Sequence, residues 1–300
     1  MGSMLTLPPL SLYIHFPWCI RKCPYCDFNS HPLRSELPEK EYIHALLRDL
    51  EDKLPQVHDR PLHSIFMGGG TPSLFSAESI AYLLAELKKR LFFTENIEIT
   101  LEANPGTTEY LRFQGYRDAG VNRLSIGVQS FEEEQLKRLG RIHDRDQAYQ
   151  AIEQAQTAGF PLINIDLMYG LPNQSVEAAL ADLRQYQLTL EPNTEFARQP
   201  PPLPADDQIA VLHEQGIKWL NAAGYEHYEI SAYSRPHAAC RHNRNYWEFG
   251  DYIGIGAGAH SKLSDETTQR IVRSWNCKQP HQYLMKETCF IAEEKIHSHG

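Results

Sequence analysis

Residues 13–28 read YIHFPWCIRKCPYCDF, and the three cysteines in this stretch, Cys19, Cys23 and Cys26, are spaced C-x3-C-x2-C. Two prolines interrupt the stretch, which predicts a loop able to curl around a ligand rather than a helix. A structural zinc site usually has four ligands in two short pairs, whereas iron–sulfur clusters are held by thiolates, normally four. Three thiolates with no fourth nearby would leave one iron open to a small molecule. The spacing therefore favours a cluster site over the alternative of three unrelated buried cysteines.

This cysteine loop follows a strand pattern and resembles the signature loop of radical S-adenosylmethionine (SAM) enzymes. The resemblance implies a [4Fe-4S] cluster whose open iron chelates the amino and carboxylate groups of SAM. Reduction of such a cluster cleaves SAM to a 5′-deoxyadenosyl radical. The surrounding sequence, LYIHFPWC…KCPYCDFNSH, closely resembles the HemW group of haem chaperones, which are relatives of oxygen-independent coproporphyrinogen III oxidase. The likeness extends over about residues 4–263 and is strongest from Leu10 to Pro172.

The composition limits the classes of protein to consider. The chain has 300 residues, 42% hydrophobic and 22% charged, which suits one large domain or a domain with an appendage. Its net charge of −9, without a long basic run, argues against a nucleic-acid partner. No apolar stretch approaches the roughly 20 residues of a membrane helix, and no signal peptide is visible. We therefore expect a cytoplasmic protein in a reducing compartment, which suits free thiolates.

Apolar strand patterns alternate with helical ones along the first two thirds of the chain. We expect strands at 10–16, 64–67, 97–101, 123–128, 162–168 and 187–191, separated by helices at about 39–54, 77–92, 107–119, 132–139, 146–158 and 175–184. Buried strands joined by helices predict parallel pairing with right-handed crossovers. Six units in about 190 residues fit an α/β fold with a partial (βα)6 TIM-like radical SAM barrel, because a closed barrel typically needs about 250.

The barrel is expected to occupy residues 5–197. Residues 1–4, MGSM, read as a cloning scar, and residues 198–300 as a proline-rich linker and a C-terminal region that we expect to be truncated. The join at 184–187 leaves almost no loop between helix and strand, so we expect residues to be missing there. Further on, a helix at 209–223 and one strand at 225–233 are predicted, and the pattern weakens beyond Leu263.

Chemistry in such folds gathers where the parallel strands end. The second strand runs into GGGTP at 68–72, and glycines let a backbone approach a ligand closely. The resemblance implies that this motif binds the amino group of SAM, and that polar residues at the following strand ends hold its amino acid, ribose and carboxylate groups. The candidate SAM residues are Tyr13, Tyr25, Gly69, Gly70, Thr71, Glu102, Gln129, Arg141 and Asp166. The alternatives are a tight turn for the glycines, an ion-pair network for the charged residues and core packing for the tyrosines.

A second motif, HNRNYW at 242–247, lies outside this set. Imidazole is a common axial ligand of haem iron, and two aromatic side chains offer flat surface to a porphyrin. The motif resembles one associated with the HemW group, which implies haem as bound cargo with His242 as its ligand. A polar loop fixed by asparagine hydrogen bonds is the structural alternative, and Cys240 is a rival iron ligand. For the glycines at 254–258 we favour close packing.

Two functions compete. The first is a haem chaperone that holds the cluster, SAM and haem, and delivers haem to respiratory haem enzymes; a homodimer and peripheral membrane contact are compatible with it. The second is a coproporphyrinogen III decarboxylase, and another radical SAM enzyme is a third option. Phe28 stands where the decarboxylase group has a further cysteine, and Cys19 lies only about fifteen residues after Met4, whereas that group has a longer arm. Both features favour the chaperone, while the sequence leaves open whether the chain is an enzyme.

Overall fold

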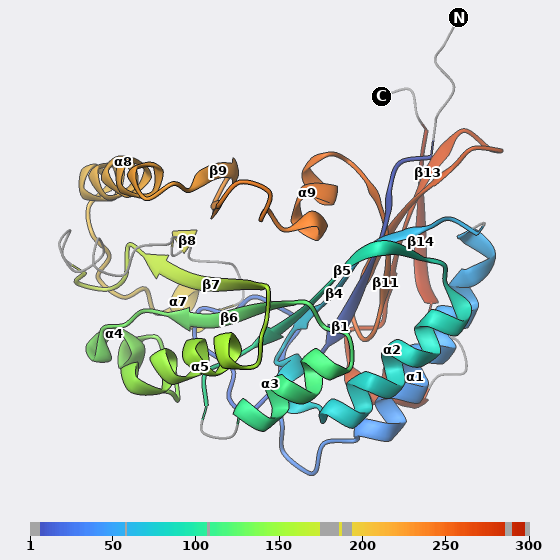
Figure 1. Cartoon of the computed structure of the whole chain (residues 1–300), viewed down its shortest axis with the longest axis horizontal. Helices are drawn as coiled ribbons and strands as arrows, with labels where there is room; N and C mark the ends of the chain where they lie inside the picture. The colour runs from blue at the N-terminus through green and yellow to red at the C-terminus, as the bar shows by residue number, and fades with distance from the viewer. Residues whose placement is uncertain are drawn as a thin grey trace, which may run out of the picture.

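The computed structural model of the chain describes residues 7–57, 59–106, 109–174, 186–187, 194–285 and 290–297 (Figure 1). Its centre is one ten-stranded sheet with the order β14-β13-β12-β11-β1-β4-β5-β6-β7-β8. The two edge strands, β14 and β8, do not pair with each other in the described part of the chain. The sheet there is therefore open.

The strands of the predicted barrel are adjacent and parallel in the expected order. They are β1 (Leu10–Phe16), β4 (Leu62–Gly69), β5 (Phe93–Ala103), β6 (Arg123–Gln129), β7 (Leu162–Tyr169) and β8 (Tyr186–Gln187). The helices between them are α1 (Glu39–Lys53), α2 (Ala77–Arg90), α3 (Glu109–Asp118), α4 (Glu133–Arg138) and α5 (Arg145–Thr157), with 3-10 turns η1 (Leu54–Gln56) and η2 (Pro72–Leu74). This arrangement confirms the predicted α/β partial barrel. The expected helix at 175–184, the join at 184–187 and most of the sixth strand lie outside the described residues.

The C-terminal region continues the same sheet. β11 (Asp251–Ile255) pairs in parallel with β1, and β12 (His260–Asp265), β13 (Arg270–Asn276) and β14 (Phe290–His297) extend it with antiparallel pairs. The sheet thus crosses the boundary that the sequence suggested at residue 198. The remaining elements are β2 (Trp18–Cys19), β3 (His31–Pro32), α7 (Glu195–Arg198), α8 (Asp206–Ala222), β9 (Glu226–Glu229), β10 (Ala232–Ser234), α9 (Arg241–Trp247) and α10 (Pro280–Met285).

One expectation about this region needs correction. Residues 225–233 do not form one strand: β9 and β10 form an antiparallel hairpin with a turn at Ile230 and Ser231. The stretch YEHYEISAY conceals the turn because it contains neither glycine nor proline. The HNRNYW motif lies in a short helix, α9, and Asn245 fixes it by donating a hydrogen bond to the Asp251 carbonyl at 2.9 Å, as the structural alternative for this motif supposed.

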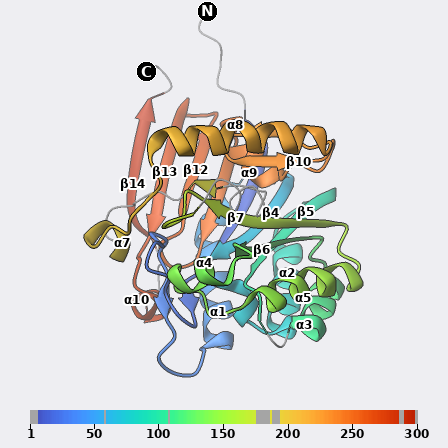
Figure 2. The ribbon, with the colours of Figure 1, turned by 90° about the vertical axis from the view of Figure 1, so that its left-hand side faces the viewer.

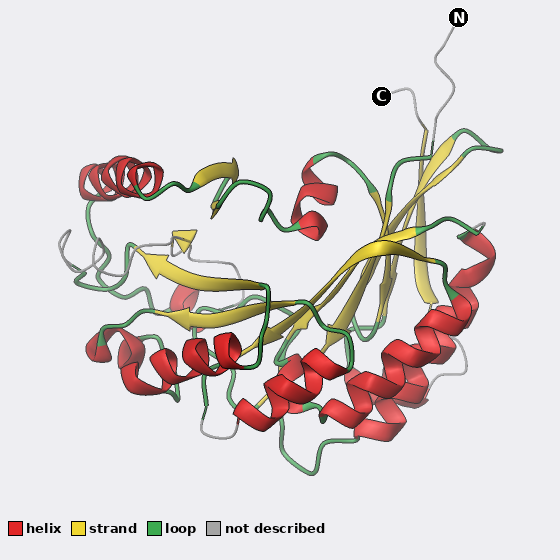
Figure 3. Ribbon diagram, viewed as in Figure 1, coloured by secondary structure: helices red, strands yellow, loops and turns green. Residues whose placement is uncertain are grey.

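The helices divide between the two faces of the sheet. α1, α2, α3 and α5 cover one face, and α8, β10 and α9 lie on the opposite, concave side in both views (Figure 1 and Figure 2). The same division is visible when the elements are coloured by type (Figure 3). No helix in the described ranges is both long and apolar enough to cross a bilayer.

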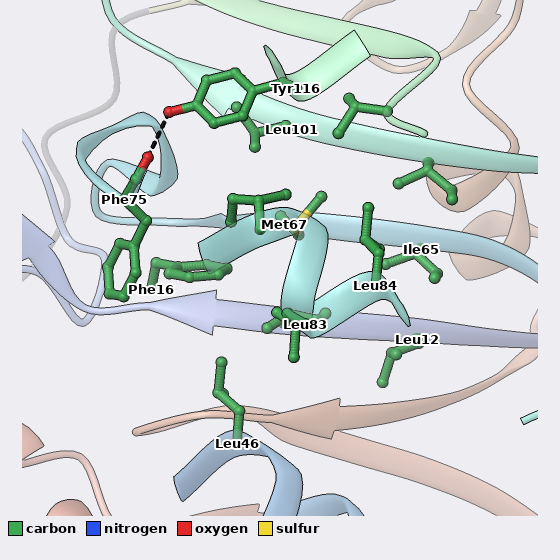
Figure 4. Close-up of a cluster of buried hydrophobic side chains, with 14 of the residues drawn as sticks. Leu12, Phe16, Leu46, Ile65, Met67, Phe75, Leu83, Leu84, Leu101 and Tyr116 are labelled. Atoms are coloured by element: carbon green, nitrogen blue, oxygen red, sulfur yellow. Dashed lines mark hydrogen bonds between the residues drawn. The ribbon is translucent and has the colours of Figure 1, made fainter. Parts of the chain in front are cut away.

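The main core lies between the sheet and its covering helices. Leu12, Ile65 and Leu101 from three neighbouring strands are fully buried against Leu83 of α2 and other apolar side chains (Figure 4). Tyr116 of α3 donates a hydrogen bond to the Phe75 carbonyl at 2.6 Å, so its hydroxyl is satisfied inside this core. This packing fixes where the parallel strands end, and the polar side chains at those ends form the site.

Candidate functional site

The cysteine loop begins directly after β1 and is closed on itself by backbone hydrogen bonds. The Cys26 N–H donates to the Cys23 carbonyl at 3.1 Å, and at the base of the loop His31 donates to the Pro17 carbonyl at 2.7 Å. All three predicted thiols are free and partly buried. They line one cavity of about 160 Å³. The structure therefore brings together the three cysteines that the spacing predicts as cluster ligands.

Each thiol has a polar neighbour suited to a thiolate. Thr71 donates its hydroxyl to Cys19 Sγ at 3.5 Å, Arg141 donates to Cys23 Sγ at 3.6 Å, and the Ser30 hydroxyl lies 3.5 Å from Cys26 Sγ. Burial raises the pKa of Cys19 and of Cys26, so binding of iron must displace their protons. In the described ranges no three His, Cys, Asp or Glu side chains converge as ligands of a single metal ion. A [4Fe-4S] cluster does not need such convergence, because each thiolate binds a different iron, and the donor set fits it.

The GGGTP turn is locked against the cysteine loop. The Gly70 N–H donates to the Phe16 carbonyl at 2.6 Å, and the Thr71 N–H donates to the Trp18 carbonyl at 2.8 Å. A Cβ at Gly70 would lie 2.5 Å from the Trp18 oxygen, which no side chain tolerates. Gly69 has a φ of +109° and packs on the His15 ring, which also favours glycine. The glycines are therefore needed for close approach of two backbones beside the cavity.

Two carboxylates, Glu102 at the end of β5 and Asp166 in β7, line the same cavity. Burial and the nearby charge of Asp166 raise the pKa of Glu102 to about 8, although Glu102 accepts a hydrogen bond from the Gly69 N–H at 3.0 Å. Burial raises the pKa of Asp166 to about 6, against the hydrogen bonds it accepts from Ser125 at 3.1 Å and Asn164 at 2.7 Å. A ligand carrying a positive charge would stabilise both carboxylates in their ionised forms.

Arg141 supplies a partly buried positive charge to the wall of the same cavity as these carboxylates. Its guanidinium donates to Asn104 Oδ1 at 2.6 Å and to the Gly127 carbonyl at 2.5 Å. Within the described structure it makes no ion pair with an aspartate or glutamate, so it retains charge for a ligand carboxylate. Gln129, at a φ of +72°, accepts a hydrogen bond from the Tyr25 hydroxyl at 3.5 Å in the same cavity wall.

Asn104 is a cavity residue that sequence reasoning missed. It donates to Thr71 Oγ1 at 2.9 Å and accepts from Arg141, so it joins the glycine turn to the guanidinium. It follows Glu102 by two residues, and strand periodicity places such a pair on the same face. That two-residue spacing is the sequence signal from which Asn104 could have been predicted. Ser125 and Asn164, which orient Asp166, were also not singled out.

Tyr13 and His242 lie together, and neither is among the residues that line the cysteine cavity. The Tyr13 hydroxyl is hydrogen-bonded to His15 Nδ1 at 2.9 Å, and its ring lies beside those of Phe66 and His242. His242 is 2% exposed, with Nδ1 3.4 Å from the Ser64 hydroxyl and Nε2 3.2 Å from the Tyr246 hydroxyl. Burial lowers the pKa of His242 to about 3, so the imidazole is neutral. As an axial ligand it would first have to release one of these contacts.

A second cavity of about 490 Å³ adjoins the first. The two share the wall residues Tyr25, Phe28, Glu102, Ser125, Gln129 and Asp166. The second cavity extends between the concave face of the sheet and the segment that carries β9, β10 and α9, which contributes Tyr228, Cys240 and Asn243. A molecule there would lie next to whatever occupies the cysteine cavity.

Comparison with known proteins identifies the family. Residues 13–183 match the family model of the radical SAM superfamily. The chain is also 55% identical over 307 residues to the heme chaperone HemW of Haemophilus influenzae, an alignment that covers 97% of this chain and 79% of that protein. The chain belongs to the HemW family of radical SAM proteins. Membership of this superfamily implies a [4Fe-4S] cluster and SAM, and the cysteine cavity has the donors that both require.

Two further relatives agree with this assignment. The heme chaperone HemW of Escherichia coli is 52% identical over 292 residues, covering 94% of this chain and 77% of that protein. Among solved structures, the radical SAM enzyme coproporphyrinogen III oxidase (HemN) of Escherichia coli matches with a TM-score of 0.81 and 26% identity. That match covers 96% of this chain and 72% of the HemN chain. The HemW family fold is thus close to that of a porphyrinogen-oxidising enzyme.

Proposed function

We propose that this HemW-family protein is a haem chaperone that holds a [4Fe-4S] cluster and SAM, binds haem, and delivers it to respiratory haem enzymes. The observation that carries the proposal is the 55% identity, over nearly the whole chain, to a protein named as a heme chaperone. The free thiols suit a reducing, cytoplasmic compartment. A homodimer and a peripheral contact with the membrane, where respiratory enzymes reside, are further parts of this proposal.

The chain's own residues have distinct roles in this proposal. Cys19, Cys23 and Cys26 would hold three irons of the cluster, which supplies electron transfer and an open iron when bound. Glu102 and Asp166 would bind the positively charged amino group and the ribose hydroxyls of SAM, because these buried carboxylates gain most from a cationic or donor partner. Arg141 would bind the SAM carboxylate. The glycine turn would present backbone groups to the amino end.

A decarboxylase acting on coproporphyrinogen III is the second candidate. The observation that favours it is the TM-score of 0.81 to the oxidase HemN, together with a second cavity beside the cysteine cavity. Phe28 argues against it: this side chain is 57% exposed and stands where the decarboxylase group is expected to have another cysteine. A fold can serve different functions, so the choice depends on what the cavities bind.

The deciding experiment is anaerobic reconstitution with iron, sulfide and SAM, followed by parallel assays with haem and with coproporphyrinogen III. We expect haem to bind stoichiometrically and to transfer to a haem-free respiratory enzyme, with no porphyrinogen turnover. Turnover with release of 5′-deoxyadenosine would instead establish the decarboxylase. Cys23→Ala should abolish cluster assembly, and a full iron count in that variant would contradict the three-thiolate site. Cys277→Ala, which removes a buried thiol outside both cavities, is the matched control.

A further inference from the structure

Asn104, which directly follows β5, connects two of the thiols of the cysteine loop. Its side-chain amide donates a hydrogen bond to Thr71 Oγ1 at 2.9 Å and accepts one from the Arg141 guanidinium at 2.6 Å. Thr71 in turn donates its hydroxyl to Cys19 Sγ at 3.5 Å, and Arg141 donates to Cys23 Sγ at 3.6 Å. These side chains therefore form one continuous hydrogen-bonded chain, with Asn104 at its centre and a thiol at each end.

The direction of each hydrogen bond in this chain follows from Arg141. A guanidinium carries only donors, so the Asn104 atom that faces it is the carbonyl oxygen, and the amide nitrogen faces Thr71. An amide nitrogen is itself only a donor, so the Thr71 oxygen accepts from it. The single proton of the Thr71 hydroxyl is then left for Cys19 Sγ. Asn104 thus makes Thr71 a donor toward this thiol.

An independent observation shows that the wall beside Asn104 is shaped to hold its side chain. A Cβ at Gly127 of β6 would lie 3.0 Å from Asn104 Oδ1 and 3.4 Å from a nitrogen of the Arg141 guanidinium. The Gly127 carbonyl also accepts a hydrogen bond from that guanidinium at 2.5 Å. A glycine inside a strand weakens the strand and often marks a close approach of another group. Here the group is the Asn104–Arg141 pair.

Hydrogen bonds to cysteine sulfur act on an iron–sulfur cluster through its charge. Reduction adds an electron, and part of the added negative charge resides on the thiolate sulfurs. Donors that face those sulfurs therefore stabilise the reduced cluster more than the oxidised one, which raises the reduction potential. The third thiol, Cys26, has a separate neighbour in the Ser30 hydroxyl at 3.5 Å. The donors to Cys19 and Cys23 are the ones that Asn104 links.

We propose that Asn104 is a positioning residue that raises the reduction potential of the cluster, because it holds Thr71 and Arg141 as hydrogen-bond donors to two of the cluster thiolates. This inference rests on the proposed function, which places a [4Fe-4S] cluster on the three thiols. The role of Asn104 is indirect, since it acts through its two neighbours. Removal of its amide should therefore make the one-electron reduction of the cluster less favourable without removing a ligand.

The test is an anaerobic redox titration of the full chain with its cluster reconstituted, followed by electron paramagnetic resonance of the reduced cluster. Asn104→Leu has a similar shape but neither donor nor acceptor. It should shift the one-electron equilibrium at least about tenfold toward the oxidised cluster, equivalent to a potential about 59 mV lower. Asn104→Asp keeps the bond from Arg141, but its carboxylate accepts the Thr71 proton, so it should also lower the potential. Asn96→Leu, at an exposed position near the start of β5, should leave the potential unchanged.

A double-substitution cycle tests whether Asn104 acts through its neighbour. Thr71→Val removes the donor to Cys19 and should itself lower the potential. In that background Asn104→Leu should lower the potential by less than it does alone, because one of the two donors that it positions is already missing. Fully additive shifts would overturn the proposal that Asn104 acts through Thr71.

The outcomes separate this inference from the proposed function. Failure of the unsubstituted protein to assemble a cluster would overturn the three-thiolate site and the proposed function with it. Equal potentials in the unsubstituted protein and in Asn104→Leu would overturn the role of Asn104 and leave the cluster site intact. If both Asn104 variants fail to hold a cluster, resonance Raman spectra of the unsubstituted protein and of Thr71→Val decide. A shift of the iron–sulfur stretches in heavy water that Thr71→Val diminishes supports the inference, and the absence of any shift overturns it.

Discussion

At the scale of single residues, the two carboxylates of the cysteine cavity are the most informative groups. Glu102 and Asp166 are held near each other, half-buried in the cavity wall, and Arg141 donates its hydrogen bonds to an amide and a carbonyl instead of forming an ion pair with either of them. A protein that needed only stability would pair or replace such groups. Carboxylates whose pKa is shifted in this way by burial and by a neighbouring like charge are concentrated at binding and catalytic sites.

We predict that Glu102→Gln stabilises the ligand-free protein, increasingly so as the pH rises. The folded pKa of Glu102 is raised from 4.5 to about 8, so its neutral form is favoured by folding. The stability that this form contributes is fully present below about pH 4.5 and is lost as the pH rises through about 8. Because water in the cavity reduces the effect, we expect the variant to gain roughly 2 kcal/mol at pH 8.

Urea unfolding at pH 5 and pH 8 measures this difference. Glu95→Gln, an exposed substitution on the same strand, should show no such dependence and serves as the control. An equal effect of Glu102→Gln at both pH values would show that Glu102 is already ionised in the folded protein, and would remove the argument that it awaits a cationic partner.

Site residues at strand ends could be predicted where the residue type is rare inside a barrel. They could not be predicted where the type is common in strands. Cysteines, glycines and charged residues at strand ends drew attention because each is costly or rare inside a barrel. Asn104 did not, because a short polar residue in a strand is commonly solvent-facing. Its role depends on the register between strands, which places Asn104 beside Thr71.

At the scale of elements, the repeating units were predictable and the hairpins were not. β1 and α5 begin or end within one residue of their predicted bounds, since apolar periodicity and turn residues agree there; Asp144 caps α5 and Gly159 follows it with a φ of +77°. β13 and β14 were missed, because the sequence beyond Leu263 carries no strong alternation. Antiparallel extension of a sheet needs a partner edge, which β12 provides for β13 and β13 provides for β14.

The position of α9 depends on one buried carboxylate from β5. Glu98 accepts hydrogen bonds from the N–H groups of Arg241 at 2.8 Å and His242 at 3.4 Å, and it pairs with Arg123. We predict that Glu98→Ala destabilises the protein by roughly 3 kcal/mol, because it leaves the buried Arg123 guanidinium without its counter-charge and two helix N–H groups without their acceptor. Chemical denaturation measures the change.

Glu95→Ala, three residues earlier and exposed, should change the free energy of unfolding by less than about 0.5 kcal/mol. A similarly small effect of Glu98→Ala would mean that α9 is held by its aromatic contacts alone. In that case the covering wall of the second cavity would not depend on the ion pair beneath it.

At the scale of the whole molecule, β11 joins the barrel strands and the C-terminal strands into one continuous sheet. It lies beside β1, which is itself paired with β4, so the first strand of the barrel has neighbours on both sides. The joint is reinforced by Asp251, which is fully buried and pairs with Arg60 at 2.8 Å and Lys262 at 3.1 Å. Those partners come from the loop before β4 and from β12 respectively.

We predict that Asp251→Ala lowers stability by about 3–5 kcal/mol, because it leaves two buried cations unpaired. Since Asp251 joins both parts of the sheet, calorimetry should show a single unfolding transition at lower temperature, and not separate melting of the C-terminal strands. Glu266→Ala, an exposed substitution beyond β12, should leave the transition in place. Two resolved transitions would show that residues 251–297 fold independently of the barrel. The segment that covers the second cavity lies between these two parts in the sequence. In that case the cavity could open without unfolding of the cysteine site.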